Sequence, residues 1–206
     1  MSTHTNTGTP QRNVIAHISM SLDGRVNGPG GASDIAWADK YADASRDLLA
    51  ELPKTATAVV LGRRNYEAFG HHWSTVLKDD SADARDRTVA QWLEKVRKIV
   101  RTSTLADGDL SWNNSRLSDP DPAAEITRLR PQPIGGDIVI LNSAGIIADL
   151  LKAKEIDRLH ITLCPETLGT GTRLFDDGIP GASWNLTTPT TAPSGATALI
   201  YDRVRG

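Results

Sequence analysis

Hydrophobic and polar positions follow two different patterns along this chain. Short apolar runs rich in β-branched residues predict buried strands. The predicted strands are VIAHISM (14–20), TAVVLG (57–62), RKIVRTS (97–103), SWNNSRL (111–117), DIVIL (137–141) and RLHITLCP (158–165), and WNLTTP with TALIYDRV predicts a terminal hairpin.

Apolar residues at near-helical spacing predict helices between these strands. They cover residues 38–52, 83–96, about 119–130 and 145–154, and a further helix begins at Arg63 and reaches Phe69. The polar segment 71–86 reads as a connection, with His71 and His72 as loop residues. Strands alternate with helices until the end, so we expect an α/β fold. Its sheet is mixed and mainly parallel, flanked by helices, with an antiparallel C-terminal hairpin.

A chain of 206 residues is long enough for one well-cored domain. The polar opening, residues 1–12, predicts a flexible tail, and residues 13–206 predict a single domain without internal repeats.

Charge and composition exclude several classes of partner. The formal net charge is −2 and basic residues are scattered, so we expect neither nucleic acid nor a membrane surface as partner. The single cysteine, Cys164, excludes an internal disulfide and a cysteine-based zinc cluster. We predict a small buried thiol, a cytoplasmic location and no metal site.

Polar and cationic residues follow three predicted strands where ligands of open α/β sheets gather. Arg63 and Arg64 follow the second strand, Thr102 and Ser103 follow the third, and Asn142-Ser143-Ala144-Gly145 follows DIVIL. Arginines, hydroxyls and the backbone N–H groups at a helix start all bind phosphate oxygens. A dinucleotide with a further phosphate on its adenosine ribose would use all three of these strand ends. The alternative is that Asn142 or Ser143 is only an N-cap.

Five segments together resemble the dihydrofolate reductase-like superfamily, in particular the reductase domain of bacterial riboflavin biosynthesis. They are SMSLDGRV (19–26), VVLGRRNYEAFGHHW (59–73), KIVRTSTL (98–105), GGDIVIL (135–141) and IDRLHITLCPETLGTGTRLF (156–175). The resemblance covers roughly residues 13–176. It implies NADPH-dependent reduction of a pterin or a pyrimidine-type compound, and in many members of this branch a homodimer.

The resemblance also implies roles for single residues. Arg63 and Arg64 match a basic pair that faces the 2′-phosphate and pyrophosphate of NADPH, and Thr102 and Ser103 match the edge that holds the 2′-phosphate. The full set of expected cofactor-binding residues is Ala16, His17, Arg63, Arg64, Asn65, Thr102, Ser103, Asn142, Ser143, Ala144 and Gly145.

Three positions depart from the pattern of the family. Asn65 replaces Thr or Ser, and Asn142-Ser143 replaces a Gly-Gly pair, so that the local conformation or the phosphate must shift. The Asp-Asp-Pro element of the riboflavin branch and the zinc motif of its partner deaminase are missing, which puts the riboflavin intermediate in doubt as substrate.

In dihydrofolate reductases proper, an acidic residue early in the helix after the first loop holds the pterin ring, and the resemblance implies a corresponding acid here. Asp43 and Asp39 are the expected catalytic acids, and Asp23, Asp34 and Trp37 the expected substrate-binding residues. The alternatives are that the acids only favour the helix dipole and that Trp37 belongs to the core.

We therefore expect an NADPH-dependent reductase of a small heterocycle. A ligand-binding module that keeps the fold without turnover is the main alternative, and a flavin-dependent oxidoreductase is a weaker one. The reductase hypothesis requires Arg63, Thr102 and Ser143 to face a common groove.

Overall fold

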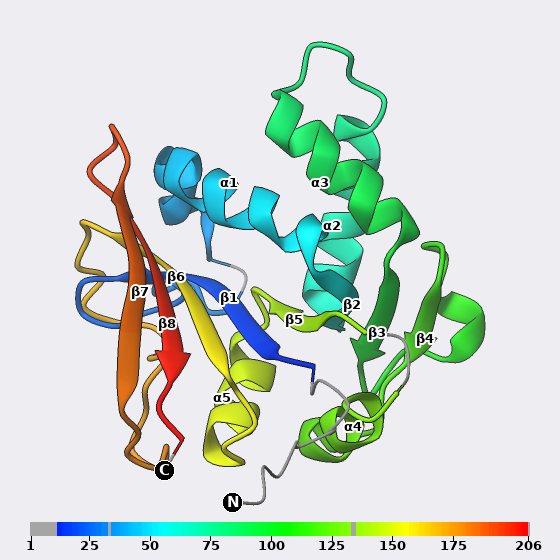
Figure 1. Ribbon diagram of the computed structural model, residues 1–206. Helices are drawn as coiled ribbons and strands as arrows, with labels where there is room; N and C mark the ends of the chain where they lie inside the picture. Colours follow the sequence, from blue (N-terminus) through cyan, green and yellow to red (C-terminus); the bar gives the residue numbers. More distant parts are fainter. Residues whose placement is uncertain (1–11, 33, 133–134, 206) are drawn as a thin grey trace, which may run out of the picture.

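Eight strands form one twisted sheet in the computed structural model, which describes residues 12–32, 34–132 and 135–205 (Figure 1). The order across the sheet is β4-β3-β2-β5-β1-β6-β8-β7. The strands are β1 (Val14–Ser21), β2 (Ala56–Gly62), β3 (Arg97–Arg101), β4 (Ser115–Leu117), β5 (Asp137–Leu141), β6 (Arg158–Cys164), β7 (Trp184–Thr191) and β8 (Thr197–Arg203). All pairs from β4 to β6 are parallel, and β8 pairs antiparallel with β6 and β7. The predicted fold class is confirmed.

The α-helices lie on both faces of this sheet. They are α1 (Ala42–Glu51), α2 (Arg63–Val76), α3 (Ala84–Lys95), α4 (Pro122–Leu129) and α5 (Ala144–Lys152). Helices α1, α2 and α3 enclose one apolar core and α4 and α5 enclose the other (Figure 1). The central strands are buried on both faces, which explains their continuous apolar sequences.

Local sequence explains several helix starts. The Asp83 side chain accepts a hydrogen bond from the Arg85 backbone N–H at 2.8 Å, and Asp121 accepts one from Ala123 at 2.9 Å. Pro122 occupies the first turn of α4, where its missing N–H costs nothing. The predicted helix entry near residue 121 is therefore confirmed.

Three predicted boundaries are wrong. Helix α2 continues through His71 to Val76 because Phe69, Trp73 and Val76 extend an apolar stripe that packs on the core, so His71 and His72 are helical. The expected helix over 38–52 is instead the 3₁₀ helix Ala36–Tyr41 followed by α1.

Arg12, predicted in the flexible tail, belongs instead to the folded domain. Its guanidinium is buried and donates to Gly136 O at 2.6 Å, Thr57 Oγ1 at 2.7 Å and Leu129 O at 3.2 Å. The remainder of that tail, residues 1–11, lies outside the described residues. Within the described chain, none of the helices has the length and apolar character needed to cross a membrane.

Candidate functional site

The carboxyl ends of β1, β2, β3 and β5 meet at one edge of the sheet. Gly62 lies in register with Arg101, and His17 with Leu141. The Gly62 N–H donates to Ser143 Oγ at 2.9 Å, and the Asn142 N–H donates to His17 O at 2.9 Å. Segments 62–65 and 142–145, which we name the strand-end junction, are thus adjacent in space although far apart in the sequence.

The Ser143 hydroxyl is used inside the protein. It donates to Leu141 O at 3.0 Å and accepts from the Gly62 N–H at 2.9 Å and Asn65 Nδ2 at 3.1 Å, which uses its single proton and both lone pairs. Ser143 holds the N-cap position of α5, but its side chain makes no capping bond to that helix. Its side chain therefore joins β2, α2 and α5, and the hydroxyl is not free toward a groove.

Asn65 and Asn142 complete this connection. Asn65 Nδ2 also donates to Asn142 O at 2.5 Å. Asn142 adopts a φ of +49°, in the left-handed region that Asn tolerates better than most residues. This is how the chain accommodates a side chain at a position with a positive φ. Asn142 Oδ1 is buried and has no hydrogen-bond partner within the described residues.

Two helix starts and two arginines remain available at the strand-end junction. The first turns of α2 and α5 contain no acidic residue, whereas those of α1, α3 and α4 each contain one. Arg63 pairs with Glu67 at 3.2 Å and its side chain is 40% exposed, and Arg64 is exposed. A Cβ added to Gly145 would meet no atom within 4 Å, so the start of α5 is open.

This donor set fits the phosphates of a dinucleotide. Helix-start N–H groups and guanidiniums both favour anions, and here they lie on neighbouring strand ends. The residues that would hold phosphate are Arg63, Arg64, Ala144 and Gly145, the last two through backbone N–H groups.

After the carboxyl end of β3, the Thr102 hydroxyl is used within the turn that follows the strand. Thr102 Oγ1 accepts from the backbone N–H groups of Thr104 at 3.0 Å and Leu105 at 3.1 Å. Ser103 is exposed beside it. Of the predicted hydroxyls at this end, Ser103 is the one left to the solvent.

A buried polar cluster lies where β1 approaches this edge. His17 and His160 are register neighbours on β1 and β6, 1% and 4% exposed, with ring centroids 6.4 Å apart. Burial lowers the pKa of His17 to about 3 and that of His160 to about 4, so both imidazoles are neutral. His17 Nδ1, both His160 nitrogens and Thr162 Oγ1 lack hydrogen-bond partners within the described chain.

Sequence reasoning found His17 in this cluster but missed His160 and Thr162. Strand alternation in RLHITLC was the available signal, since residues two apart share a face. Ala16 was expected beside the cofactor, but its side chain belongs to the core on the opposite face.

Of the two expected acids, Asp43 is bonded to another part of the fold and Asp39 is exposed. The Asp43 carboxylate accepts from Ser194 Oγ at 2.7 Å and Ser194 N at 3.2 Å, in the turn between β7 and β8. These bonds, chiefly that from the hydroxyl, lower the pKa of Asp43. Asp39 is exposed on the 3₁₀ helix. Trp37 packs against the small cluster around Tyr41 and Cys164.

Asp23 joins two loops, residues 23–27 and 168–174, which we name the loop pair. Its carboxylate accepts from the N–H groups of Leu168 at 3.0 Å and Gly169 at 2.9 Å and from Ser21 Oγ at 2.7 Å. These bonds, led by that from Ser21, hold the pKa of Asp23 well below its usual range. Asp34 lies beyond the loop pair and accepts from the Gly30 N–H at 3.0 Å.

The rest of the loop pair is bonded just as densely. Asn27 Oδ1 accepts from the Thr172 N–H at 2.7 Å, and Arg25 Nη1 donates to Gly171 O at 2.5 Å. Gly171 has a φ of +106°, and a Cβ there would lie 2.1 Å from Asn27 O. The DGRVN and LGTGTR motifs are therefore two halves of one structural unit.

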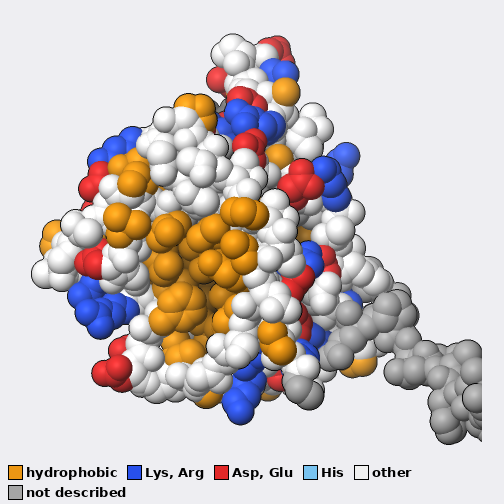
Figure 2. All heavy atoms as spheres, turned by 60° about the vertical axis from the view of Figure 1, so that its left-hand side comes forward, with side chains coloured by type: hydrophobic (Ala, Val, Ile, Leu, Met, Phe, Trp, Pro, Cys, Tyr) orange, Lys and Arg blue, Asp and Glu red, His pale blue; other side chains and the backbone are white. Residues whose placement is uncertain are grey.

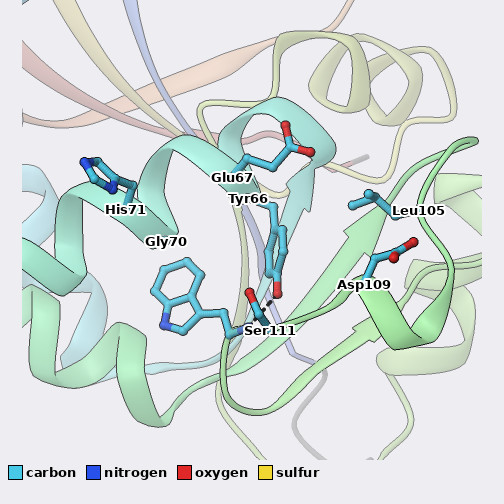
Figure 3. A pocket seen from close by; sticks show the side chains of 8 residues that line it. Tyr66, Glu67, Gly70, His71, Leu105, Asp109 and Ser111 are labelled. Atoms are coloured by element: carbon cyan, nitrogen blue, oxygen red, sulfur yellow. Dashed lines mark hydrogen bonds between the residues drawn. The ribbon is translucent and has the colours of Figure 1, made fainter.

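A surface hollow of about 270 Å³ lies farther along α2, beside the β3–β4 connection (Figure 3). Tyr66 reaches from α2 to this connection, where its hydroxyl accepts from the Trp112 N–H at 2.8 Å. The hollow is lined by Tyr66, Glu67, Gly70, His71, Leu105, Asp109, Ser111 and Trp112. None of these belongs to the predicted site, although Glu67 is the partner of Arg63.

The model of the RibD C-terminal domain family matches residues 12–197, and the chain belongs to this family. It is 23% identical over 194 residues to the "Uncharacterized protein YyaP" of Bacillus subtilis (strain 168), covering 93% of this chain and 95% of that protein. The resemblance to the riboflavin-biosynthesis branch is thereby confirmed.

Solved structures share the fold at low sequence identity. The diaminohydroxyphosphoribosylaminopyrimidine deaminase/5-amino-6-(5-phosphoribosylamino)uracil reductase of Thermotoga maritima matches with a TM-score of 0.62 and 12% identity, over 94% of this chain and 57% of that one. Dihydrofolate reductase from Enterococcus faecalis, solved with NADP(H), matches with a TM-score of 0.52 and 16% identity, over 94% of this chain and 98% of that one. At these identities, the likeness concerns the fold.

Proposed function

We propose that this protein is an NADPH-dependent reductase of a small heterocyclic substrate, pterin-like or pyrimidine-type. The strand-end junction carries the proposal, because two acid-free helix starts and two arginines come together where β2 and β5 end. The chain belongs to the RibD C-terminal domain family and shares its fold with dihydrofolate reductase, which supports the proposal. Cys164 is buried with its pKa raised to about 12, and such an unreactive thiol fits the cytoplasmic location that we propose.

In this proposal Arg63 and Arg64 bind the phosphates that distinguish NADPH from NADH. Arg63 would exchange its exposed pairing with Glu67 for a phosphate, which costs little because exposed ion pairs are weak. The N–H groups of Ala144 and Gly145 bind the pyrophosphate, while Ser143 and Asn65 keep the two helix starts in place.

A bound nicotinamide dinucleotide supplies the hydride, and the chain supplies orientation and a dry site. His17 in the middle of β1 and His160 and Thr162 on the neighbouring β6 offer neutral donors and acceptors, which suit uncharged polar groups of a heterocycle. Asp43 and Asp39 remain the proposed acids. Because hydrogen bonds lower the pKa of Asp43, this carboxylate would bind substrate as an anion and leave proton donation to another group.

Titration of the full chain with NADPH and NADH, followed by tryptophan fluorescence, tests the proposal. We expect NADPH to bind more tightly. Arg63→Ala and Arg64→Ala should each weaken NADPH binding by about 1.5–3 kcal/mol, roughly 10- to 150-fold, and change NADH binding little. Arg85→Ala is the matched control, because the Arg85 side chain on α3 is 41% exposed and ion-paired, as Arg63 is. Equal or absent binding of the two dinucleotides would contradict the proposal.

A second candidate is a binding module without turnover. The internal bonds of Ser143, Thr102 and Asp43 favour it, since each side chain is already used by the protein. NADPH binding without NADPH oxidation across a panel of pterins and pyrimidines would select the module. Oxidation with any of them would select the reductase.

A further inference from the structure

The two edges of the sheet carry different side chains. Figure 2 shows the side of the molecule that β7 and β8 form, where an apolar area occupies the centre and charged side chains are dispersed around it. At the β4 edge, a surface hollow of about 440 Å³ lies where β3 and β4 begin (Figure 1). Among the described residues, this basic hollow is lined by three cations, one amide and no carboxylate: Lys95, Arg97, Asn114 and Arg116. Small-ligand sites in proteins have volumes of this order, so the basic hollow can hold a small molecule.

Strand register directs the two guanidiniums of the basic hollow to the same side. Arg116 pairs with Ile99 across β3 and β4, and Arg97 lies two positions before Ile99. Both arginines therefore share the sheet face on which α4 packs. Lys95 approaches from the last residue of α3. Because β3 spans roughly 13 Å and the strand-end junction lies beyond its other end, the two places are separate.

Two cations of the basic hollow have no counter-ion. In the part of the chain that the structure describes, neither Lys95 nor Arg97 forms an ion pair, and Arg97 donates instead to the neutral Gln132 Oε1 at 2.8 Å. Burial and the charge of Arg97 lower the pKa of Arg12, whereas Asp137 raises it. The guanidiniums of Arg12 and Arg97 are thus close enough to repel one another. An anion in the basic hollow would reduce this repulsion.

The third cation, Arg116, is only partly neutralised. It pairs with Glu125, whose side chain is 1% exposed and pairs with Arg128 as well. Two guanidiniums share one carboxylate, so this group keeps one positive charge. The buried acid also fixes the orientation of Arg116 while 36% of the arginine side chain remains exposed. A cation held in this way loses little freedom when it binds an anion.

The end of α3 does not oppose an anion here. Carbonyl groups in the last turn of a helix carry partial negative charge and repel anions. Lys98 Nζ donates to two of these carbonyls, Leu93 O at 2.5 Å and Val96 O at 2.9 Å. Asn114 Nδ2 donates to a third, Lys95 O, at 2.9 Å. Lys98 is buried, which lowers its pKa to about 8, so at neutral pH its ammonium is charged and offsets the negative end of the helix.

We propose that the basic hollow binds the phosphate group of a small molecule. A phosphate ester carries about 1.5 to 2 negative charges near neutral pH and accepts paired hydrogen bonds from guanidiniums. Cations from three separate segments suit such a group better than they suit a single carboxylate. The volume of the hollow also leaves room for the remainder of the molecule. The inference rests on this surface and does not depend on the proposed reductase activity.

Isothermal titration calorimetry of the full chain with inorganic phosphate and with glycerol 3-phosphate, at low ionic strength, tests the basic hollow. Lys95→Gln and Arg97→Gln should each weaken binding about 10-fold, because each removes a charged donor without breaking an ion pair. Lys78→Gln is the matched control, since Lys78 is exposed and forms no ion pair among the residues described, as is true of Lys95. This control should leave binding unchanged.

The Arg63→Ala/Arg64→Ala double variant separates the basic hollow from the strand-end junction, whose arginines also favour anions. Phosphate binding should persist in it, and NADPH binding should be unchanged in Arg97→Gln. The failure of either proposal is therefore visible without the other. Of the two probes, the one that binds more tightly identifies the source of the phosphate group, a free anion or an ester.

Three results would overturn the proposal, once urea unfolding has shown that each variant is folded. The first is a heat of binding no larger than that of sodium acetate at the same ionic strength. The second is loss of all phosphate binding in the Arg63→Ala/Arg64→Ala variant. The third is equal binding by Lys95→Gln, Arg97→Gln and Lys78→Gln, because the anion would then not bind in the basic hollow.

Discussion

The loop pair and the strand-end junction contain similar residues but use them differently. In the loop pair, the Asp23 carboxylate and the Asn27 side chain bond to backbone groups of the facing loop. In the strand-end junction, the Ser143 and Asn65 side chains bond inward, while the start of α5 is open, Arg64 is exposed and Arg63 bonds only to the exposed Glu67. A polar motif is thus structural where its hydrogen-bonding groups are satisfied, and available for a ligand where they are not.

The largest change in stability that we expect comes from a substitution at Gly171 in the loop pair, whereas the same substitution at Gly145 in the strand-end junction should leave stability nearly unchanged. Gly171→Ala places a Cβ against Asn27 O at a positive φ and should lower the free energy of unfolding by at least about 3 kcal/mol. Gly145→Ala has open space and should change stability by less than about 0.5 kcal/mol, while weakening NADPH binding. Urea unfolding and a dinucleotide titration measure the two effects. If the two variants lost the same amount of unfolding free energy, the loop pair would not be more tightly packed than the strand-end junction, contrary to this prediction.

Asp23→Asn should destabilise the loop pair in a pH-dependent way. Because the pKa of Asp23 is lowered in the folded state, its stabilising effect is present above the unfolded pKa of about 3.9 and is lost as the pH falls further. The difference in unfolding free energy between the unmodified chain and the variant should therefore be constant near neutral pH and shrink below about pH 4. The exposed Asp177→Asn is the control and should show little difference at any pH. A difference in unfolding free energy that persists below pH 4 would mean that the charge of Asp23 does not stabilise the loop pair.

Ser143→Ala tests the connection within the strand-end junction. Removing the hydroxyl leaves the Gly62 N–H and one Asn65 proton without their acceptor and should cost about 1–2 kcal/mol of unfolding free energy. Dinucleotide binding should weaken too, because the two helix starts lose their connection. Ser103→Ala, at an exposed serine of the neighbouring strand end, should change stability by less than about 0.5 kcal/mol. A thermal melt that does not distinguish the two variants would refute the structural role of Ser143.

Asn142→Gly should cause the smallest change in the free energy of unfolding. Glycine adopts the φ of +49° without strain and removes a buried oxygen that lacks a partner, but it also gives the unfolded chain more freedom. These contributions oppose one another, so stability should change by less than about 1 kcal/mol. Asn142→Ala lacks the tolerance of Asn for this conformation and should be the less stable of the two in urea unfolding. The reverse order would show that the Asn142 side chain itself holds the turn.

Sequence by itself determined the order of strands and helices and the sheet edge at which the candidate ligand-binding residues lie. Apolar runs, helical spacing and turn residues act locally, so β1, β5, α3 and α4 are recognisable without knowing their neighbours. The parallel arrangement then follows from their alternation, and it brings Gly62, Arg101 and Asn142 to one edge.

Tertiary structure decided which polar groups are free. Ser143 and Asp23 look equally available in the sequence, but their partners Gly62 and Leu168 lie 81 and 145 positions away, beyond any local pattern. His160 and Thr162 became visible only when β6 was placed beside β1. Hydrogen bonding and burial depend on such long-range contacts, and those exist only in the folded chain.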